Sequence, residues 1–480
     1  MIKTRFVSLL FLCAVLLAPS FSSSAATQDV NKLPAPVQQA LQRFKLDGNG
    51  LSILVKAVDS NKIVLQHNAD VPRNPASTIK LLTSFAALDL LTPSHRWVTD
   101  IHGDGDLQNG ALNGDLWMIG GGDPFLPLER LWLMVHQLRM TGLSTIHGDL
   151  YIDQSLFEPV VENPAAFDNQ GLRAYNVVPA PLVSNFNVSL LLFRPSSISN
   201  RVDVEVIPDL PGLDIKNNLR TANTSCRGYN RGIAMNLNTE GQLILDGRFP
   251  ARCKIYGMSR SVMNRDTYTA ELFRMLWRQA GGVWNGTLRT GNRSFEDKPL
   301  LAFESVSLSE AVRSINKYSN NLMTRMLFLY LSVDQQGSPG STEKSRAAIN
   351  AWLDRQNLNR DGLFIDNGAG SSRQTRATAR QFSGLLSHAW QSAYMPELLA
   401  SMAVTGQDGT FSRRHVSGPL NGRAHMKTGR LDHVVAMAGY LQAKSNKRYV
   451  VVVQHNNTDV HRGSGHAVQD ALLKWLYSRY

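Results

Sequence analysis

The sequence is poor in cysteine and, beyond its first 20 residues, has no long hydrophobic run. Only three cysteines occur among 480 residues, too few for a small scaffold held together by disulfides. No later apolar run approaches the roughly 18 residues of a membrane-spanning helix. Hydrophobic residues make up 43% and charged residues 18% of the chain, which is ordinary for a globular protein. Disordered, collagen-like and coiled-coil chains are therefore excluded as descriptions of the whole.

The beginning of the chain has the layout of a secretory signal peptide. Two basic residues precede an apolar run over residues 6–17, and small residues at 24–26 provide a cleavage site. We therefore expect residues 1–26 to be removed on export. In an oxidising compartment Cys226 and Cys253 can form one disulfide, with two buried thiols as the alternative.

Lysine and arginine outnumber aspartate and glutamate by 50 to 38, a net charge of +12. Removal of a signal peptide leaves about +10. This charge favours anionic partners such as nucleic acid, a membrane surface or an acidic cell-wall polymer. The chain has neither a lysine and arginine block nor interleaved aromatic residues, so a solvated basic surface is an equal alternative, and we expect no nucleic-acid partner.

Strand patterns near both ends of the chain predict one shared sheet. Residues 51–58 and 63–67 are typical of a β-hairpin, and residues 434–443 and 449–454 repeat the pattern. Residues 466–480 have helical spacing. We expect the two ends of the chain to meet in one antiparallel sheet.

The middle of the chain differs in composition. Residues 97–300 are rich in glycine, asparagine, aspartate and proline and contain many short β-like runs. Helical patterns resume over residues 308–331 and 341–356. We therefore expect residues 27–96 and 301–480 to form one domain that is interrupted by one or two inserted β-rich domains.

The stretch 74–80 (Asn-Pro-Ala-Ser-Thr-Ile-Lys) contains the first candidate site. A proline suited to a helix start and the apolar residues that follow predict a buried helix. Ser77 would lie at its beginning, with Lys80 one turn later on the same face. Burial lowers the pKa of a lysine, which makes it a base toward the serine hydroxyl. Ser-x-x-Lys also occurs at 314–317 and 341–344, where a surface serine and a helix N-cap explain it.

Two more short motifs follow in the chain. Ser319 and Asn321 lie two residues apart in a helical region and can form a polar wall. Lys427, Thr428 and Gly429 precede an apolar strand and provide a charge for a carboxylate, a hydroxyl donor and space for a substrate backbone. Taken singly, each motif has a structural alternative, a polar turn or a turn leading into a strand. Together and in this order, the three motifs are the signature of penicillin-binding proteins and class A β-lactamases.

The chain resembles the class C, penicillin-binding protein 4 type D-alanyl-D-alanine carboxypeptidases/endopeptidases of the bacterial envelope. The long separation of Lys80 from Ser319 fits the inserted domains of that family. The resemblance implies an α/β (α+β) penicillin-binding transpeptidase-like fold, an antiparallel five-stranded sheet with helices on both faces. Four further stretches look like the family: residues 120–124, 148–153, 366–370 and 406–410.

The resemblance also implies a role for each side chain. Ser77 is the nucleophile that attacks the D-Ala–D-Ala carbonyl and becomes acylated. Lys80 accepts its proton, and Ser319 relays a proton to the leaving amine. Asn321 would bind the substrate amide and position the lysine.

Lys427 and Thr428 would hold the terminal carboxylate of the substrate, beside Gly429. The backbone N–H groups of Ser77 and Arg430 would form the oxyanion hole. Threonine or serine is usual at the position of Arg430, so this cation bears on substrate choice. We expect neither a metal nor a cofactor.

The motif around Ser319 allows two registers. Tyr318 with Asn320 matches the Tyr-x-Asn motif of class C β-lactamases. We prefer Ser319 with Asn321, because Leu322 follows and the insertion is long. Asparagine at 320 replaces the more common aspartate, and this middle residue contributes least.

We expect a periplasmic serine D,D-peptidase that hydrolyses D-Ala-D-Ala or D-Ala-meso-diaminopimelate bonds in peptidoglycan stem peptides and is acylated by β-lactam antibiotics. A β-lactamase on the same scaffold and a non-catalytic wall-binding protein are alternatives. Membrane association would be peripheral at most. The balance of the two peptidase activities, the role of the insert and the oligomeric state stay open. A metallopeptidase would use histidines near the end of the chain, although His-Glu-x-x-His is missing: His425, His433, His455, His461 and His466.

Overall fold

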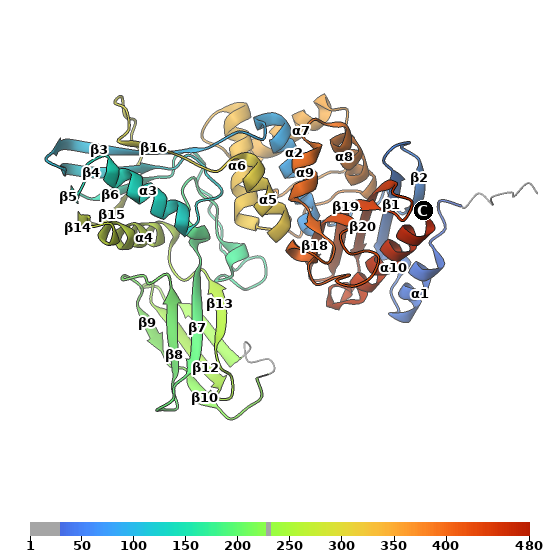
Figure 1. Cartoon of the computed structure of the whole chain (residues 1–480), viewed down its shortest axis with the longest axis horizontal. Coiled ribbons are helices and arrows are strands. Elements are labelled where there is room, and N and C mark those ends of the chain that lie inside the picture. Colours follow the sequence, from blue (N-terminus) through green and yellow to red (C-terminus); the bar gives the residue numbers. More distant parts are fainter. Residues whose placement is uncertain (1–28, 227–231) are drawn as a thin grey trace, which may run out of the picture.

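A computed structural model describes residues 29–226 and 232–480. The expected signal peptide, residues 1–26, lies outside this part. In the described part of the chain, no helix is long and apolar enough to cross a membrane. Figure 1 shows the blue and the orange-to-red segments together in one body, while the teal and green middle of the chain forms two further lobes.

An antiparallel sheet built from both ends of the chain forms the centre of the larger body. Its order is β17-β18-β19-β20-β1-β2, and β1 pairs with β20 along its whole length. The expected meeting of the two chain ends is thus confirmed. The sheet has six strands where we expected five, because β17 is a two-residue edge strand, too short to give a hydrophobic pattern. The strands are β1 (Leu51–Ala57), β2 (Ile63–His67), β17 (Ala403–Val404), β18 (Ala424–Leu431), β19 (Val434–Gln442) and β20 (Arg448–Asn456).

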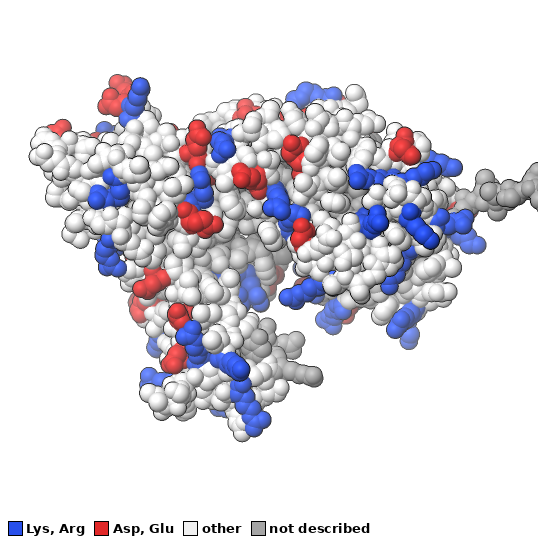
Figure 2. Space-filling view, in the orientation of Figure 1, with Lys and Arg blue, Asp and Glu red and all other residues white. Residues whose placement is uncertain are grey.

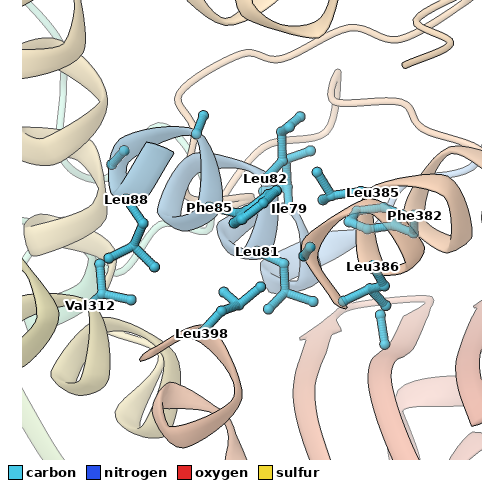
Figure 3. Packing of buried hydrophobic residues seen from close by; sticks show 14 of the residues in the cluster. Ile79, Leu81, Leu82, Phe85, Leu88, Val312, Phe382, Leu385, Leu386 and Leu398 are labelled. Atoms are coloured by element: carbon cyan, nitrogen blue, oxygen red, sulfur yellow. The ribbon is translucent and has the colours of Figure 1, made fainter. Parts of the chain in front are cut away.

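Helices cover both faces of this sheet. On one face α2 lies at the centre of a core shared with α5, α6, α7 and α8, and ten of its twelve residues are buried. Figure 3 shows its apolar side chains meeting those of α5, α8 and α9. The other face is covered by α1 and α10. The helices are α1 (Ala35–Arg43), α2 (Lys80–Leu91), α5 (Leu308–Tyr318), α6 (Asn321–Gln336), α7 (Thr342–Arg355), α8 (Ala379–Gln391), α9 (Met395–Ser401) and α10 (Ser464–Arg479).

A second sheet, of seven strands, lies in the middle of the chain, and two helices pack on it. We expected β-rich structure here and missed both helices, α3 (Leu128–Met140) and α4 (Arg265–Gln279). Their apolar residues have helical spacing, but they lie among glycine-rich and proline-rich loops. The strands are β3 (Val98–Gln108), β4 (Ala111–Ile119), β5 (Thr145–Ile146), β6 (Leu150–Asp153), β14 (Val283–Trp284), β15 (Leu288–Thr290) and β16 (Leu301–Glu304).

Two smaller sheets enclose a core of their own. Cys226 and Cys253, which follow β10 and β12 in the chain, form a disulfide with a Cα–Cα distance of 5.7 Å. The structure thereby answers the question that the sequence left open. The strands are β7 (Ser189–Pro195), β8 (Val202–Ile207), β9 (Ile215–Asn217), β10 (Arg220–Ala222), β11 (Ile233–Leu237), β12 (Leu243–Pro250) and β13 (Tyr256–Arg260).

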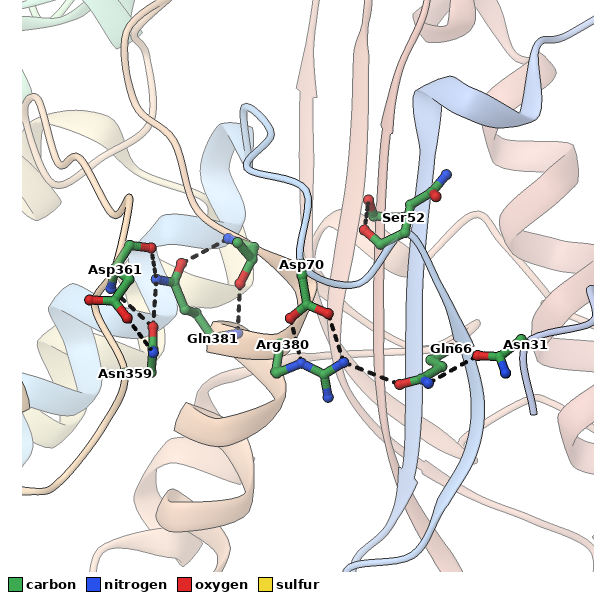
Figure 4. A network of polar contacts seen from close by, with 10 residues as sticks. Asn31, Ser52, Gln66, Asp70, Asn359, Asp361, Arg380 and Gln381 are labelled. Atoms are coloured by element: carbon green, nitrogen blue, oxygen red, sulfur yellow. Dashed lines mark hydrogen bonds and ion pairs between the residues drawn. The ribbon is translucent and has the colours of Figure 1, made fainter.

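Polar contacts fasten the first turn of α8 to the end of β2 (Figure 4). Arg380 donates to both carboxylate oxygens of Asp70, at 2.5 and 2.9 Å, and to Gln66 Oε1 at 3.2 Å. The ion pair is exposed and contributes at most about 1 kcal/mol. Its effect is positional, because the chain continues from Asp70 directly to the turn that carries Ser77.

Candidate active site

Ser77 lies in a tight turn that precedes the buried helix. The sequence predicts one helix from Pro75 onward. Instead, the short 3₁₀ helix η2 (Ala76–Ile79) carries Ser77, and α2 begins at Lys80. The α-helix does not begin at Pro75 because the next residue, Ala76, is fully buried and has a left-handed backbone with a φ of +46°. A left-handed alanine costs about 1–2 kcal/mol, so the surroundings must hold this turn in place.

Asn74 provides that hold. Its backbone N–H donates to Asn456 Oδ1 at 2.8 Å, and Asn456 Nδ2 donates to the carbonyl of Asn74 at 3.1 Å. The Asn74 side chain accepts from the N–H of Ala76 at 2.9 Å and donates to the carbonyl of Ser372 at 2.8 Å. Because Asn456 ends β20, these bonds fasten the turn of Ser77 to the central sheet.

Lys80 is fully buried and reaches three oxygen atoms. Its Nζ lies 3.1 Å from Ser77 Oγ and 2.8 Å from Asn321 Oδ1, and it also contacts the carbonyl oxygen of Ala369. The amide and carbonyl oxygens can only accept, so they take two N–H bonds. In the neutral amine, the remaining position toward Ser77 is the lone pair. This geometry suits proton transfer from the hydroxyl to the lysine.

A second buried lysine lies close to the first. Burial lowers the pKa of Lys80 well below its ordinary value, and the charge of Lys427 lowers it further. Burial also lowers the pKa of Lys427 to about 7. The lowered pKa of Lys80 makes its amine available as a base toward the Ser77 hydroxyl.

Ser319 and Asn321 lie at the junction of α5 and α6. Ser319 ends α5 with a φ of +59°, and Asn320 caps α6 by accepting from the N–H of Met323 at 3.1 Å. Asn321 then begins α6 and faces Lys80, whereas Tyr318 is 71% exposed. The side chains that meet the other motifs are therefore Ser319 and Asn321. Aspartate at 320 would cap the helix equally well, which explains why asparagine is tolerated there.

The side chains of Ser319 and Asn321 both make further hydrogen bonds. Asn321 Nδ2 donates to the backbone carbonyl of Tyr175 at 3.1 Å, which leaves one amide hydrogen for a substrate. Ser319 Oγ accepts from Lys427 Nζ at 2.9 Å. The three motifs of the sequence thus form one connected set of contacts around Ser77.

Lys427, Thr428 and Gly429 lie on β18, beside the turn of Ser77. Lys427 Nζ also donates to the carbonyl of Thr428 at 2.8 Å, and Thr428 Oγ1 donates to Thr410 Oγ1 at 2.7 Å. A Cβ atom at Gly429 would lie 2.9 Å from both the backbone nitrogen of Ser77 and a neighbouring carbonyl oxygen. Only glycine lets the strand approach the nucleophile this closely.

An ion pair that none of the three motifs indicated lies behind Ser319. Lys317 is buried and donates to Asp408 Oδ2 at 2.5 Å and to the carbonyl of Met402 at 2.9 Å. Asp408 Oδ1 accepts from the N–H of Val404 at 2.8 Å. The pair links the end of α5 to the loop that carries Thr410. Asp408 belongs to the stretch 406–410 that resembles the family, and this resemblance was the one indication in the sequence that Asp408 is important.

A cavity of about 430 Å³ opens over these groups. Ser77, Ser319, Asn321 and Arg430 line it, whereas Lys80 and Lys427 are buried below. Its outer wall comes from residues that no motif indicated: Phe167, Asp168, Tyr175, Arg373 and Asp432.

This outer wall is internally bonded. Tyr175 Oη donates to Asp168 at 2.7 Å, and burial together with that carboxylate raises the pKa of Tyr175 to about 12. The guanidinium of Arg373 lies over the Phe167 ring at 5.0 Å and 3.8 Å from the carboxylate of Asp432. The wall therefore presents charged groups to any ligand of Ser77.

The metallopeptidase alternative depends on the histidines. His433, Asp459 and His461 place one possible ligand atom each within 4.8 Å of one another. However, His461 Nδ1 accepts from the N–H of His433 at 2.9 Å, and His433 Nδ1 accepts from the N–H of Asp459 at 3.1 Å. A neutral ring that accepts at Nδ1 carries its proton on Nε2, so neither nitrogen has a free lone pair for a metal. The other three histidines do not join this group within the described residues.

The geometry agrees with the comparison to known proteins. Residues 33–478 match the D-Ala-D-Ala carboxypeptidase 3 (S13) family. The chain belongs to this family. It is 24% identical to the D-alanyl-D-alanine carboxypeptidase DacB of Haemophilus influenzae over 88% of its length and 86% of that protein. It is also 24% identical to a D-alanyl-D-alanine carboxypeptidase of Actinomadura sp. over 95% of its length and 86% of that protein.

Solved structures show the same fold. Penicillin binding protein 4 of Haemophilus influenzae matches with a TM-score of 0.78 and 22% identity, over 92% of this chain and 99% of that one. A predatory peptidoglycan endopeptidase of Bdellovibrio bacteriovorus matches with a TM-score of 0.52 and 16% identity, over 88% and 92%. These matches confirm the predicted α/β class and transpeptidase-like fold. Membership of the S13 family makes this protein a serine peptidase.

Proposed function

We propose that this S13 peptidase hydrolyses the D-Ala-D-Ala ends and the D-Ala-meso-diaminopimelate cross-links of peptidoglycan stem peptides through an acyl-Ser77 intermediate. One observation carries the assignment of residues. Asn321 and the Ala369 carbonyl occupy two sides of the buried Lys80 nitrogen, which directs its lone pair to Ser77 Oγ. The family description and the names of the curated relatives support the substrate.

In the proposed acylation, Lys80 Nζ takes the proton of Ser77 Oγ as this oxygen attacks the carbonyl carbon of the penultimate D-Ala. The backbone N–H groups of Ser77 and Arg430 stabilise the oxyanion. When the C–N bond breaks, the amine leaves with the proton that Lys80 took from Ser77, relayed through the Ser319 hydroxyl, so Lys80 is neutral again. Water then attacks the ester carbonyl and Lys80 accepts one of its protons. As the ester C–O bond breaks, Lys80 returns this proton to Ser77 Oγ and the shortened peptide leaves as a carboxylate.

Lys427 and Thr428 hold the terminal carboxylate of the substrate in this proposal. Burial lowers the pKa of Lys427 to about 7 in the enzyme without substrate. A bound carboxylate raises this pKa, because the opposite charge favours the ammonium form. Charged Lys427 also keeps Ser319 oriented through their 2.9 Å bond. Substrate binding and proton delivery are thus coupled through one lysine.

The proposal includes the cellular setting. Export removes residues 1–26, the protein acts in the periplasm, and residues 27–96 with 301–480 form the peptidase domain around the insert 97–300. β-Lactam antibiotics acylate Ser77 as inhibitors; a structure of the Haemophilus protein contains a β-lactam. Figure 2 shows lysine and arginine spread over the peptidase body near α1 and α10, which suits an anionic wall polymer.

Intact mass after incubation with benzylpenicillin tests the proposal. We expect a one-to-one adduct on the wild type and on Ser314→Ala, the serine of another Ser-x-x-Lys match, but none on Ser77→Ala. Ser77→Ala should also lower muropeptide hydrolysis by about 10⁶-fold. Consumption of the drug without an adduct would indicate a β-lactamase. Absence of both adduct and consumption would indicate a non-catalytic scaffold, and an adduct on Ser77→Ala would overturn the assignment.

A further inference from the structure

A second cavity lies behind the wall of the active site. It has a volume of about 470 Å³, within the range of small-ligand sites. Segment 160–178 contributes to both cavities, with Asp168 and Tyr175 on the active-site side and Leu172 and Val178 on the other. Anything bound in the second cavity therefore contacts the reverse side of the segment that touches Asn321.

Asn187 lines this cavity, and one polar atom of its side chain has no hydrogen-bond partner among the described residues. The side chain is 5% exposed, and its Nδ2 donates to Ser261 Oγ at 3.0 Å and to the carbonyl of Met263 at 3.2 Å. Its Oδ1 is buried and has no partner. A buried acceptor without a donor destabilises the folded protein, and a hydrogen bond from a ligand N–H or O–H group would remove this cost.

The backbone around Asn187 is strained. Asn185, Phe186 and Asn187 have φ values of +47°, +56° and +51°, a left-handed conformation that asparagine tolerates but that is unfavourable for phenylalanine. Tyr268 and a backbone carbonyl hold the first of them through its side chain, at 2.9 and 3.0 Å. Strain of this kind is concentrated at functional sites.

The other lining residues define the chemistry of a ligand. None of those that the structure describes there carries a carboxylate, and the one cation, Arg265, is paired with Asp266 at 3.2 Å. Asn238 Oδ1 accepts a backbone hydrogen bond in a turn and Asn264 Oδ1 caps α4, so the NH₂ groups of both side chains are available as donors. Leucine, valine, proline and methionine side chains complete the wall. Amides and hydroxyls beside apolar surface suit a neutral ligand with hydroxyl, amide and methyl groups.

We propose that this cavity binds the N-acetylated glycan strand of peptidoglycan, with an acetamido N–H donating to Asn187 Oδ1 and its methyl group against the apolar wall. The proposal rests on the proposed function, because it supplies the polymer whose stem peptide enters the active site. A stem peptide is a poorer match, because it carries carboxylates, and Arg265, the one cation among the described lining residues, is already paired with Asp266. Binding would hold the polymeric substrate while Ser77 acts on a stem peptide.

The test measures binding apart from catalysis. The full mature chain with Ser77→Ala is titrated calorimetrically with an N-acetylglucosamine tetrasaccharide, with maltotetraose as the sugar that lacks acetamido groups. Thr239→Trp fills the cavity from its exposed rim, and Glu240→Trp places the same side chain on the next residue, which does not line the cavity. Asn187→Gly removes the acceptor and accepts the left-handed backbone.

We expect binding of the acetylated sugar alone, weakened at least 10-fold by Thr239→Trp and by Asn187→Gly but not by Glu240→Trp. With Ser77 intact, Thr239→Trp should slow hydrolysis of intact sacculi at least 10-fold and leave a soluble pentapeptide unaffected. Equal binding by both tryptophan variants, no binding of the tetrasaccharide, or binding of the pentapeptide in its place would overturn the proposal. Failure of the proposed function is distinguishable, because pentapeptide hydrolysis would then be absent while the calorimetric result stands.

Discussion

Replacing Lys427 with methionine removes a charge that folding buries. Burial lowers the pKa of this lysine from 10.5 to about 7. At about 1.4 kcal/mol per pH unit, keeping the ammonium in the folded protein costs about 5 kcal/mol. The variant loses the hydrogen bonds to Ser319 and to the Thr428 carbonyl, about 1 kcal/mol each. We therefore expect Lys427→Met to be about 3 kcal/mol more stable than the wild type near pH 6, and inactive toward a carboxylate-bearing substrate.

The stability difference depends on pH with a definite sign. Unfolded Lys427 keeps its proton up to its ordinary pKa of 10.5, whereas the folded lysine loses it near 7. Between these values the unfolded state binds one more proton, so this residue makes wild-type stability rise with pH by up to about 1.4 kcal/mol per unit. The methionine variant lacks this slope. Its advantage should therefore be largest below pH 7 and disappear near about pH 9.

Urea unfolding at about pH 6, 7.5 and 9 measures this difference. Lys444→Met, at an exposed lysine, is the matched control and should follow the wild type at every pH. The rate of acylation by benzylpenicillin is measured in parallel and should fall for Lys427→Met alone. A difference in the free energy of unfolding that is the same at all three pH values, or a variant less stable than the wild type at the lowest pH, would refute the reasoning.

Four further substitutions test other contacts of the site by the rate of benzylpenicillin acylation. Gly429→Ala puts a methyl group 2.9 Å from the nucleophile's backbone nitrogen and should slow acylation about 100-fold; a near-normal rate would show that the strand can move aside. Asn320→Asp keeps the helix cap and should change the rate less than about twofold. Asn321→Asp puts a carboxylate beside Lys80, raises the pKa of this lysine and should abolish acylation. Equal effects of the two variants would contradict the choice of Ser319 with Asn321 as the functional pair. Asp408→Asn leaves buried Lys317 without its ion pair and should lower the free energy of unfolding by about 3 kcal/mol and slow acylation, and an unchanged urea midpoint would count against that role.

Local patterns were sufficient for much of the fold. Alternating and apolar runs predicted β1, β2, β19 and β20 within one or two residues, because both faces of the central sheet are buried and strands there must be hydrophobic. The patterns failed where structure is short or strained. β17 has only two residues, and the left-handed Ala76, which turns the expected helix start into η2, leaves no mark in a hydrophobicity pattern.

The residue pattern alone indicated which groups are available for chemistry: Ser77 and Lys80 three residues apart before a buried helix, and a lysine on an apolar strand. The partners that each group meets depend on the fold. Asn321 and the Ala369 carbonyl set the direction of the Lys80 lone pair from more than 200 residues away in the chain. Hydrogen bonds act over about 3 Å in space and leave no periodic pattern in the sequence, so the distance between partners had to come from the fold.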